Sequence, residues 1–393
     1  MENFSFYAPT YFQFGKDSEK EVGNLVNRFG GHKVLLHYGG GSIKKSGLYD
    51  TVITCLKDSG IPFVELGGVK PNPRSGLVYE GIDLCRKEGI DFVLAVGGGS
   101  VIDSAKAIAA GTVDDGDFWD FYMHKREITS ALPVGTILTI AAAGSEGSPN
   151  SVITNEENQY KRGAGAECLR PCFSILNPQF TCTLPPYQTA SGITDIMVHV
   201  CERYFSPTKD VEITDRLCEG VLKTLIHEAP IVMENPMDYQ ARANIMWAGM
   251  VAHNNICGVG RVQDWASHAL EHEVSGLYDV THGAGLAVIM PAWMKYVSSK
   301  SPDKFVTFAT RVFDVDAQNK SKADIVLEGI NRFRSFLSSI GMPESLKEFG
   351  VSEGDLEKMA HCILSTTGEI GGYMKLTVED MINIYQLAYG GKE

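Results

Sequence analysis

The 393-residue sequence has no long hydrophobic run, no excess of positive charge and no CxxC cysteine pair. No apolar stretch approaches the roughly 18 residues that a helix needs to cross a bilayer, which argues against a membrane protein. The formal net charge is −13 and no face rich in lysine or arginine is evident, so nucleic acids and anionic membranes are poor partner candidates. The start of the chain, residues 1–4, lacks the basic and then apolar pattern of a signal peptide.

The nine cysteines form an odd set, and although Cys168 and Cys172 are four residues apart, no second pair follows them. This usage predicts reduced, mostly buried thiols and a cytoplasmic protein. Apolar residues make up 44% of the chain and charged residues 21%, which is ordinary for a folded protein and argues against disorder. The length exceeds what one compact core usually holds, so two or three domains are expected.

The first half of the chain alternates short β-branched runs with amphipathic helical segments, a pattern typical of parallel βαβ units. Strands are predicted at 34–38, 62–66, 92–96, 137–143 and 173–176, and helices at 44–58, 75–88 and 101–111. The run 92–96 contains no polar residue, as expected for a strand that is covered on both faces.

From Tyr187 onward the apolar residues follow the helical period, and β-rich runs are scarce. Long helical segments are predicted at 187–205, 210–228, 238–256 and 322–340. The predicted fold class is therefore α/β plus all-α. A Rossmann-like dinucleotide-binding domain is expected over residues 1–186, followed by an all-α domain over residues 187–393.

Two glycine-rich turns follow predicted strands and precede predicted helices. In the turn Gly97-Gly98-Gly99-Ser100, the glycines allow backbone N–H groups to approach a phosphate, and the next helix N-terminus adds partial positive charge. Ser100 and Asp103 also have the spacing of a helix-capping pair. A tight, capped turn without a ligand is an equally good interpretation, because the G-x-G-x-x-G fingerprint fails at Ile102.

The earlier turn, Gly39-Gly40-Gly41-Ser42, is followed by Ile43-Lys44-Lys45. It lacks an acidic residue at the strand end, where a ribose 2′-hydroxyl is usually bound. Its hydroxyl, open amides and lysines would instead suit a 2′-phosphate. Taken alone, a solvated helix start with two surface lysines is the better interpretation of this turn.

One aspartate and several of the ten histidines have the spacing of metal ligands. Asp195 and His199 are four residues apart in a helical run, so both lie on one helix face, and His268 and His272 repeat that spacing. With His282, they form a set that suits Fe²⁺ or Zn²⁺ and suits Ca²⁺ or Mg²⁺ poorly. Spacing does not decide which four of the five bind, and a salt-bridged Asp195–His199 pair in a core stays an alternative.

Three other patterns are interpreted without a functional role. Asp264 precedes a helix that begins at Trp265 and is taken as its N-cap. His253 and Cys257 are also four apart, but their surroundings are typical of helix-end packing. The sequence 144–147 is not a nucleophile elbow, which requires Gly-x-Ser-x-Gly.

Together these motifs resemble those of the iron-containing (group III) alcohol dehydrogenases, and closely those of their NADPH-dependent butanol dehydrogenase branch. The matching stretches are spread over nearly the whole chain, at 3–16, 38–45, 71–73, 97–106, 144–146, 195–199, 264–268 and 282–283. The resemblance implies an N-terminal nucleotide-binding α/β domain and a C-terminal helical metal-binding domain, an architecture shared with dehydroquinate synthase.

The resemblance also assigns residues to the metal and to the chemistry. It implies that Asp195, His199, His268 and His282 hold a divalent metal, Fe²⁺ first and Zn²⁺ as the alternative. His272 matches a family histidine that lies near the nicotinamide and is usually not a ligand. It is therefore the predicted catalytic residue, with a supporting role at the metal site as its alternative.

A second set of residues is implied to contact the dinucleotide. Its members are Gly39, Gly40, Gly41, Ser42, Lys45, Asn72, Gly97, Gly98, Gly99, Ser100, Asp103, Thr139, Asn150, Lys161 and Leu184. The turn 39–42 replaces the aspartate of NAD-preferring members, which implies NADP(H). The segment 140–143 stands where many relatives have more hydroxyl groups, so its contacts with adenine and ribose stay open.

The predicted reaction is hydride transfer between NADP(H) and a small primary alcohol or aldehyde, such as butanol or butanal, with the metal as a Lewis acid. One alternative is a lyase resembling dehydroquinate synthase, which should carry a basic pocket that is not evident near the ligand helices. The other is a non-catalytic NADP-binding redox sensor, against which the complete ligand set argues. Relatives dimerise through their α/β domains, so a homodimer is expected, with the run 4–14 as a candidate crossing strand.

Overall fold

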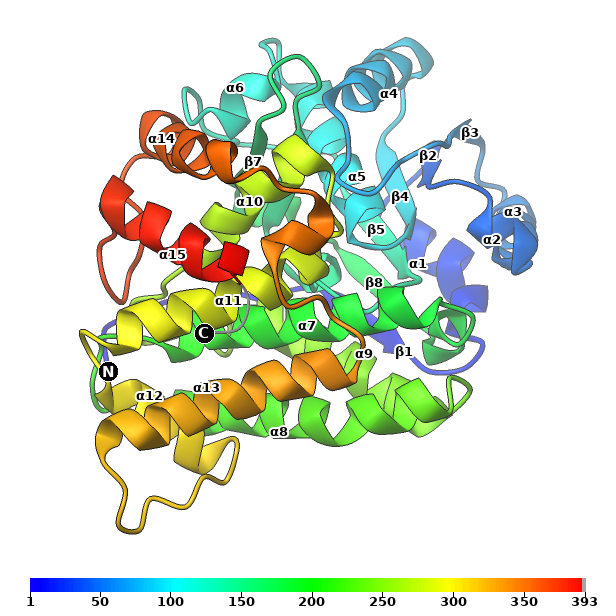
Figure 1. Cartoon of the computed structure of the whole chain (residues 1–393). Helices are drawn as coiled ribbons and strands as arrows, with labels where there is room; N and C mark the ends of the chain where they lie inside the picture. Colours follow the sequence, from blue (N-terminus) through cyan, green and yellow to red (C-terminus); the bar gives the residue numbers. More distant parts are fainter. Residues whose placement is uncertain (391–393) are drawn as a thin grey trace. The chain divides into compact units, whose positions relative to one another are not determined.

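A computed structural model describes residues 1–390 of the chain (Figure 1), and these residues form two compact units. The α/β unit comprises residues 7–184 and 237–246. Among the described residues, the helical unit comprises 1–6, 185–236 and 247–390. A single division at residue 186 does not describe two short segments: residues 1–6 belong to the helical unit, and residues 237–246 belong to the α/β unit. The domain boundary at residue 186 stays a prediction.

The α/β unit is built on a six-stranded parallel sheet with the order β1-β8-β5-β4-β2-β3. The strands are β1 (Tyr11–Phe14), β2 (Val34–Tyr38), β3 (Phe63–Leu66), β4 (Phe92–Gly97), β5 (Val134–Leu138) and β8 (Phe173–Leu176). The helices of this unit are α1 (Val22–Arg28), α2 (Ser42–Lys45), α3 (Leu48–Asp58), α4 (Ser75–Glu88), α5 (Gly99–Val113) and α6 (Trp119–Tyr122). The α/β prediction for this part of the chain is confirmed.

Both faces of the sheet are apolar, and β4 shows why an uninterrupted apolar run was needed. Val93 and Ala95 enter one buried cluster together with residues of α4 and α5. Leu94 and Val96 enter the opposite cluster together with residues of α1 and α3. Because side chains alternate along a strand, a central strand with helices on both faces must be apolar at every position.

Two predicted elements of this unit are wrong in extent. The strand predicted at 137–143 ends at Leu138, where the register with β4 also ends at Gly97, and the segment 139–143 continues without a partner strand. The helix predicted at 44–58 is two helices, α2 and α3, separated by Ser46 and by Gly47, which has a φ of 79°. Glycine adopts this left-handed conformation without the steric cost that other residues meet, so the chain turns there.

The sequence did not predict the antiparallel hairpin of β6 (Asn150–Thr154) and β7 (Lys161–Gly165). Its second strand, Lys-Arg-Gly-Ala-Gly, lacks the β-branched alternation that marks a strand. The hairpin packs on α5. The Ser151 hydroxyl and the Val152 amide donate to the carbonyl and the carboxylate of Asp103, and the buried ammonium of Lys106 donates to the carbonyl of Asn150. Such long-range support has no local sequence pattern.

The helical unit contains α7 (Pro186–Tyr204), α8 (Glu212–Glu234), α10 (Ala266–Tyr278), α11 (His282–Ser298), α12 (Asp303–Arg311), α13 (Lys322–Ser339), α14 (Leu356–Thr366) and α15 (Val378–Gly390). Helix α9 (Tyr239–His253) divides between the units, its residues from 247 belonging here. The all-α prediction for this unit is confirmed, and α7 packs against both α8 and α11 while α10 packs against α11. Among residues 1–390, no helix combines the length and apolarity that a membrane span requires.

Candidate metal centre

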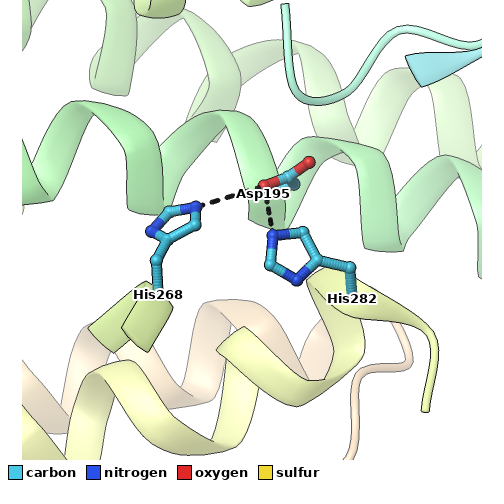
Figure 2. Close-up of side chains that lie close together, drawn as sticks. All are labelled: Asp195, His268 and His282. Atoms are coloured by element: carbon cyan, nitrogen blue, oxygen red, sulfur yellow. Dashed lines mark ion pairs between the residues drawn. The ribbon is translucent and has the colours of Figure 1, made fainter. Parts of the chain in front are cut away.

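Three helices of the helical unit bring the predicted ligands together. Asp195 and His199 lie on α7, His268 lies in the first turn of α10, and His282 is the first residue of α11. The Oδ1 atom of Asp195 is 3.4 Å from Nε2 of His199, 3.8 Å from Nε2 of His268 and 3.7 Å from Nε2 of His282. Figure 2 shows the rings of His268 and His282 turned toward the carboxylate from the two neighbouring helices.

These distances fit donors that share one ion. Ligands about 2.1 Å from a tetrahedrally coordinated ion lie roughly 3.4 Å from one another, close to the separations observed here. The Oδ1 atom of Asp195 and Nε2 of His268 are also buried and form no hydrogen bond. A buried polar atom without a partner is costly, and a divalent cation would satisfy both atoms at once. The residues present therefore fit the metal that the sequence predicts.

His199 occupies a different position in this group. The donor atoms of Asp195, His268 and His282 all lie within 4.8 Å of one another, whereas His199 is outside that mutually close set. Burial lowers the pKa of His199 well below its usual value, and the charged form of His253, whose ring centroid is 4.2 Å away, acts in the same direction. A neutral imidazole keeps a lone pair for a metal.

Two buried glutamates that were not predicted from the sequence accept hydrogen bonds from two of the histidines. Glu202 of α7 accepts a hydrogen bond from Nδ1 of His268, and Glu271 of α10 accepts one from Nδ1 of His282. For His268, burial lowers the pKa, but the charges of Glu202 and Asp195 outweigh it and raise the pKa to about 9. The two carboxylates therefore favour a positive charge at His268, either a proton on the ring or a cation beside it.

A sequence signal for Glu202 was available. It follows Asp195 by seven residues and therefore lies on the helix face that already carries Asp195 and His199. A third polar residue on one face of an otherwise apolar helix is costly to bury unless it has a partner. Nothing local marks Glu271, because its partner His282 belongs to the following helix.

Small residues let α11 approach the helices that carry the other ligands. A Cβ atom at Gly283 would lie 2.0 Å from the carbonyl oxygen of Ser191 on α7. A Cβ atom at Gly285 would lie 2.7 Å from Oε1 of Glu271 on α10. Both glycines are therefore required by close packing next to His282.

His272, the predicted catalytic residue, lies beside the ligand group. Its ring centroid is 5.5 Å from that of His282 and 6.3 Å from that of His268, and the residue is only partly buried. It also forms, with Glu271 and His282, a second set of closely spaced donor atoms. This placement agrees with a residue next to the metal position, and its role stays a prediction.

The capping interpretation of Asp264 needs a correction. Helix α10 begins at Ala266, and its N-cap position is Trp265, with a φ of 66°. The carboxylate of Asp264 still accepts a hydrogen bond from the Ala266 amide, at 2.9 Å, and another from the Tyr373 amide, at 2.7 Å. Burial raises the pKa of Asp264 to about 7, with the charge of Glu202 as a further cause.

In the α/β unit, the turn Gly97-Gly98-Gly99-Ser100 lies where β4 ends and α5 begins. Because the first amides of a helix have no acceptor within it, those of Gly99 and Ser100 are available to a phosphate. A Cβ atom at Gly98 would lie 3.2 Å from the side chain of Ile140, so a larger residue would crowd the turn. The amide of Thr139 bonds the carbonyl of Gly97, at 3.0 Å, which keeps the segment 139–143 beside this turn.

The predicted capping pair of Ser100 and Asp103 is wrong. The N-cap of α5 is Gly98 without a side-chain cap, and Asp103 instead accepts hydrogen bonds from Oγ of Ser145, at 2.6 Å, and from the Val152 amide, at 3.0 Å. The Asp103 carboxylate is thereby turned toward the segment around β6 and not toward the amides of its own helix start.

Lys106, one turn after Asp103 on α5, completes this connection. Its buried ammonium group donates to Ser145, Ser148 and Asn150 at 2.7–2.9 Å. Burial lowers the pKa of Lys106 to about 8, while Asp103 acts in the opposite direction. The predicted dinucleotide contact Asn150 is thus tied through its carbonyl to the helix that follows the glycine turn.

The other predicted dinucleotide contacts lie in separate parts of the α/β unit. Gly39, Gly40, Gly41 and Ser42 lead from β2 into α2, a Cβ atom at Gly40 or Gly41 would meet nothing within 4 Å, and Lys45 is exposed. Asn72, with a φ of 51°, precedes Pro73, whose carbonyl accepts from Thr154, the strand partner of Lys161. Leu184 is partly buried, and its amide donates to the carbonyl of Thr181.

Comparison with known proteins decides the family. Residues 9–178 match the sequence model of the iron-containing alcohol dehydrogenases, and residues 189–389 match the model of the C-terminal part of the Fe-containing alcohol dehydrogenase family. The chain belongs to the iron-containing alcohol dehydrogenase family. It is an oxidoreductase of the alcohol dehydrogenase type, as the sequence motifs implied.

Three relatives illustrate the range of the family around this chain. It is 44% identical to the probable NADH-dependent butanol dehydrogenase 2 of Bacillus subtilis, over 98% of this chain and 99% of that protein. It is 36% identical to the NADPH-dependent aldehyde reductase YqhD of Escherichia coli, over 89% and 90% of the two chains. The crystal structure of NADH-dependent butanol dehydrogenase A from Thermotoga maritima superposes with a TM-score of 0.96, at 42% identity and 99% coverage of both chains.

Proposed function

We propose that this chain is a metal-dependent, NADP(H)-linked dehydrogenase that interconverts small primary alcohols and aldehydes, such as butanol and butanal. The single observation that carries the proposal is the convergence of three histidine Nε2 atoms on Oδ1 of Asp195, at 3.4–3.8 Å. A bound divalent ion, Fe²⁺ first and Zn²⁺ as the alternative, would supply Lewis acidity toward a carbonyl oxygen.

The chain's own residues account for the rest of the chemistry. Asp195, His199, His268 and His282 would hold the ion, and one carboxylate among neutral imidazoles would leave it positively charged. His272 lies beside His282 and is partly exposed, so its imidazole could donate a proton to a developing alkoxide or take one from an alcohol. The reduced nicotinamide supplies the hydride when it is bound.

The NADP(H) part of the proposal is supported by the turn after β2. No carboxylate stands at 39–42, and Lys44 is held there with its ammonium 5.1 Å from the ring centroid of Tyr38 and 4.7 Å from that of Tyr49. The nearby carboxylate of Glu65 accepts hydrogen bonds from both tyrosine hydroxyls. The Bacillus subtilis relative is named as NADH-dependent, which favours NADH as the cofactor. The preference for NADPH therefore has a test of its own, separate from that of the metal.

The reaction is tested by following NADPH oxidation across a series of linear aldehydes, with metal content measured on the same preparation. His268→Ala should lose both the metal and turnover while NADPH binding, followed by its fluorescence, is kept. His361→Ala, which changes an exposed histidine on α14, is the matched control and should behave as the wild type. Full activity in metal-free protein would contradict the proposal.

The cofactor is tested by the ratio of kcat/KM for NADPH to that for NADH with butanal as substrate. We expect the ratio to favour NADPH at least tenfold and to fall when Lys44 and Lys45 are replaced by methionine, because a 2′-phosphate would lose its cations. A ratio in favour of NADH would overturn this part and leave the metal chemistry standing. A homodimer and a cytoplasmic location stay predictions.

A further inference from the structure

Two buried carboxylates contact the proposed metal ligands from behind. Glu202 bonds both the backbone amide of His268, at 3.1 Å from Oε1, and the ring Nδ1 of the same residue through Oε2. Glu271 bonds Nδ1 of His282 through Oε2, and its Oε1 accepts from the hydroxyl of Ser275. Both glutamate side chains are wholly buried.

These contacts define which ring nitrogen faces which way. An imidazole that donates from Nδ1 to a carboxylate carries its lone pair on Nε2. In both His268 and His282 the nitrogen facing Asp195 is Nε2. The hydrogen bonds to the glutamates therefore select the tautomer that can coordinate an ion beside Asp195.

The charges point in the same direction. Glu202, Glu271 and Asp195 are buried carboxylates that contact the same two histidine rings, and burial of like charges is costly without a cation among them. A divalent ion would offset this repulsion. A carboxylate that accepts from a ligand histidine also makes the ring a stronger donor to the metal.

We propose that Glu202 and Glu271 are positioning residues of the metal site, each holding one histidine ligand in its Nε2-coordinating tautomer and raising its affinity for the ion. The inference rests on the proposed function, because it requires a metal at Asp195. His199 has no such support, since its Nδ1 is buried without a hydrogen-bond partner. The two supported histidines therefore contribute more to metal retention than His199 does.

Glu202→Gln and Glu271→Gln test the proposal, because glutamine keeps the size and an acceptor oxygen but removes the charge. The zinc-loaded proteins are mixed with an excess of a chromogenic chelator, and the rate of zinc release is followed. Each variant should release zinc roughly 10–100-fold faster than the wild type. Release within twofold of the wild-type rate in both variants would overturn the inference.

Glu219→Gln is the matched control, because Glu219 is also a buried glutamate of the helical unit. Its contacts are with Tyr204, Arg216 and Arg311 and not with a proposed ligand. It should lower stability without changing zinc release. Equal acceleration in the control would show a general effect of losing a buried carboxylate and would overturn the specific role.

A measurement on the wild-type chain keeps the inference testable if a variant fails to fold. Long-range ¹H–¹⁵N spectra of the ¹⁵N-histidine-labelled, zinc-loaded protein report which ring nitrogen carries the proton. His268 and His282 should be protonated at Nδ1 and coordinated through Nε2, and the opposite assignment would overturn the proposal. A wild-type chain that binds no stoichiometric zinc would overturn the proposed metal site itself, a result distinct from normal binding with unaffected variants.

Discussion

At the scale of single residues, His37 shows how a buried polar side chain is accommodated in the α/β unit. It lies on β2, is wholly buried, and bonds the carbonyl of Leu66 on one side and the hydroxyl of Ser104 on the other, both at 2.9 Å. Both ring nitrogens thus have partners in the neutral form. Burial lowers the pKa of His37 to about 4.

This shift predicts a loss of stability in mild acid. Below pH 6.5 the unfolded chain takes up a proton at this histidine, whereas the folded protein does so only near pH 4, so stability falls as the pH falls through this window. The shift corresponds to about 3 kcal/mol in total. His37→Gln should show a shallower decline of the unfolding midpoint between pH 6.5 and 4, measured by circular dichroism.

The control for this prediction is His124→Gln, which changes an exposed histidine of the same unit. It should keep the wild-type decline. A variant at His37 whose pH profile parallels the wild type would show that this side chain does not report on acid unfolding.

At the scale of elements, the approach of α11 to α10 depends on Gly285. A methyl group there would come within 2.7 Å of Oε1 of Glu271, and that oxygen is held by Ser275. Gly285→Ala should therefore cost about 1–3 kcal/mol through overpacking and should speed zinc release. Both effects are measured on one preparation, by thermal unfolding and by chelator competition.

Gly220→Ala on α8 separates this effect from the general effect of glycine in a helix. A Cβ atom at Gly220 would meet nothing within 4 Å, so alanine should stabilise the helix by about 0.5–1 kcal/mol and leave zinc release unchanged. If the two variants shifted the unfolding temperature in the same direction, the close packing at Gly285 would not be the cause.

A second element-scale prediction concerns Lys106, which joins α5 to the segment before β6. Lys106→Met keeps the aliphatic stem but leaves the oxygens of Ser145, Ser148 and Asn150 without their donor. Leaving these buried oxygens without a donor should lower the free energy of unfolding by about 3 kcal/mol. The apparent unfolding temperature of this unit should then fall by roughly 6–12 °C.

The readout that identifies a role in cofactor binding is the dissociation constant for NADPH. It should rise in Lys106→Met at a temperature where the variant is still folded, because the segment that carries Asn150 is no longer fixed. Lys57→Met, which changes an exposed lysine of α3, should leave both stability and NADPH binding unchanged. Unaltered NADPH affinity in Lys106→Met would limit Lys106 to stability.

Local pattern predicted the elements well where one physical period dominates. The segments 34–38, 75–88 and 173–176 agree with β2, α4 and β8 because apolar periodicity, strand length and turn residues all point the same way. Pattern failed at Ile140–Ala143, where an apolar run continues after the neighbouring strand has ended. Hydrophobicity describes burial, and it does not say whether a partner strand is present.

For the candidate site as well, the sequence predicted local features but not the pairing of side chains across elements. Asp195 and His199 were visible because both lie on one helix and their spacing is local. Glu271 was missed and the capping role of Asp103 was wrong, because the partners of both side chains are distant in sequence or belong to another element. Side-chain pairing across elements is set by packing, which the linear pattern does not contain.

At the scale of the whole molecule, the chain is not divided in sequence order. The amide of Glu2 donates a hydrogen bond to the carbonyl of Gly260, at 2.9 Å, and the amino group of Met1 donates one to the carbonyl of Lys209, at 3.2 Å. The first six residues therefore group with the helical unit, while the strand β1 that follows belongs to the α/β sheet. No local preference of a short exposed segment would predict such contacts.

This division predicts where each ligand should act on backbone dynamics. A ligand that binds only the folded state lowers local opening around the groups it contacts, so zinc should slow hydrogen exchange in α7, α10 and the start of α11. NADPH should slow exchange at 39–42 and 97–101 in the α/β unit. Exchange followed by mass spectrometry, with each ligand added alone, measures both patterns.

His268→Ala gives this last prediction its control. Zinc should no longer protect the three helices in this variant, because the ring that faces Asp195 is lost, whereas NADPH should protect both glycine turns as before. Retained zinc protection in the variant would place the ion elsewhere and contradict the proposed ligand set. Loss of protection by both ligands would mean that the substitution disturbs more than the metal site. Loss of zinc protection alone, with NADPH protection retained, would show that each ligand contacts its own group of residues.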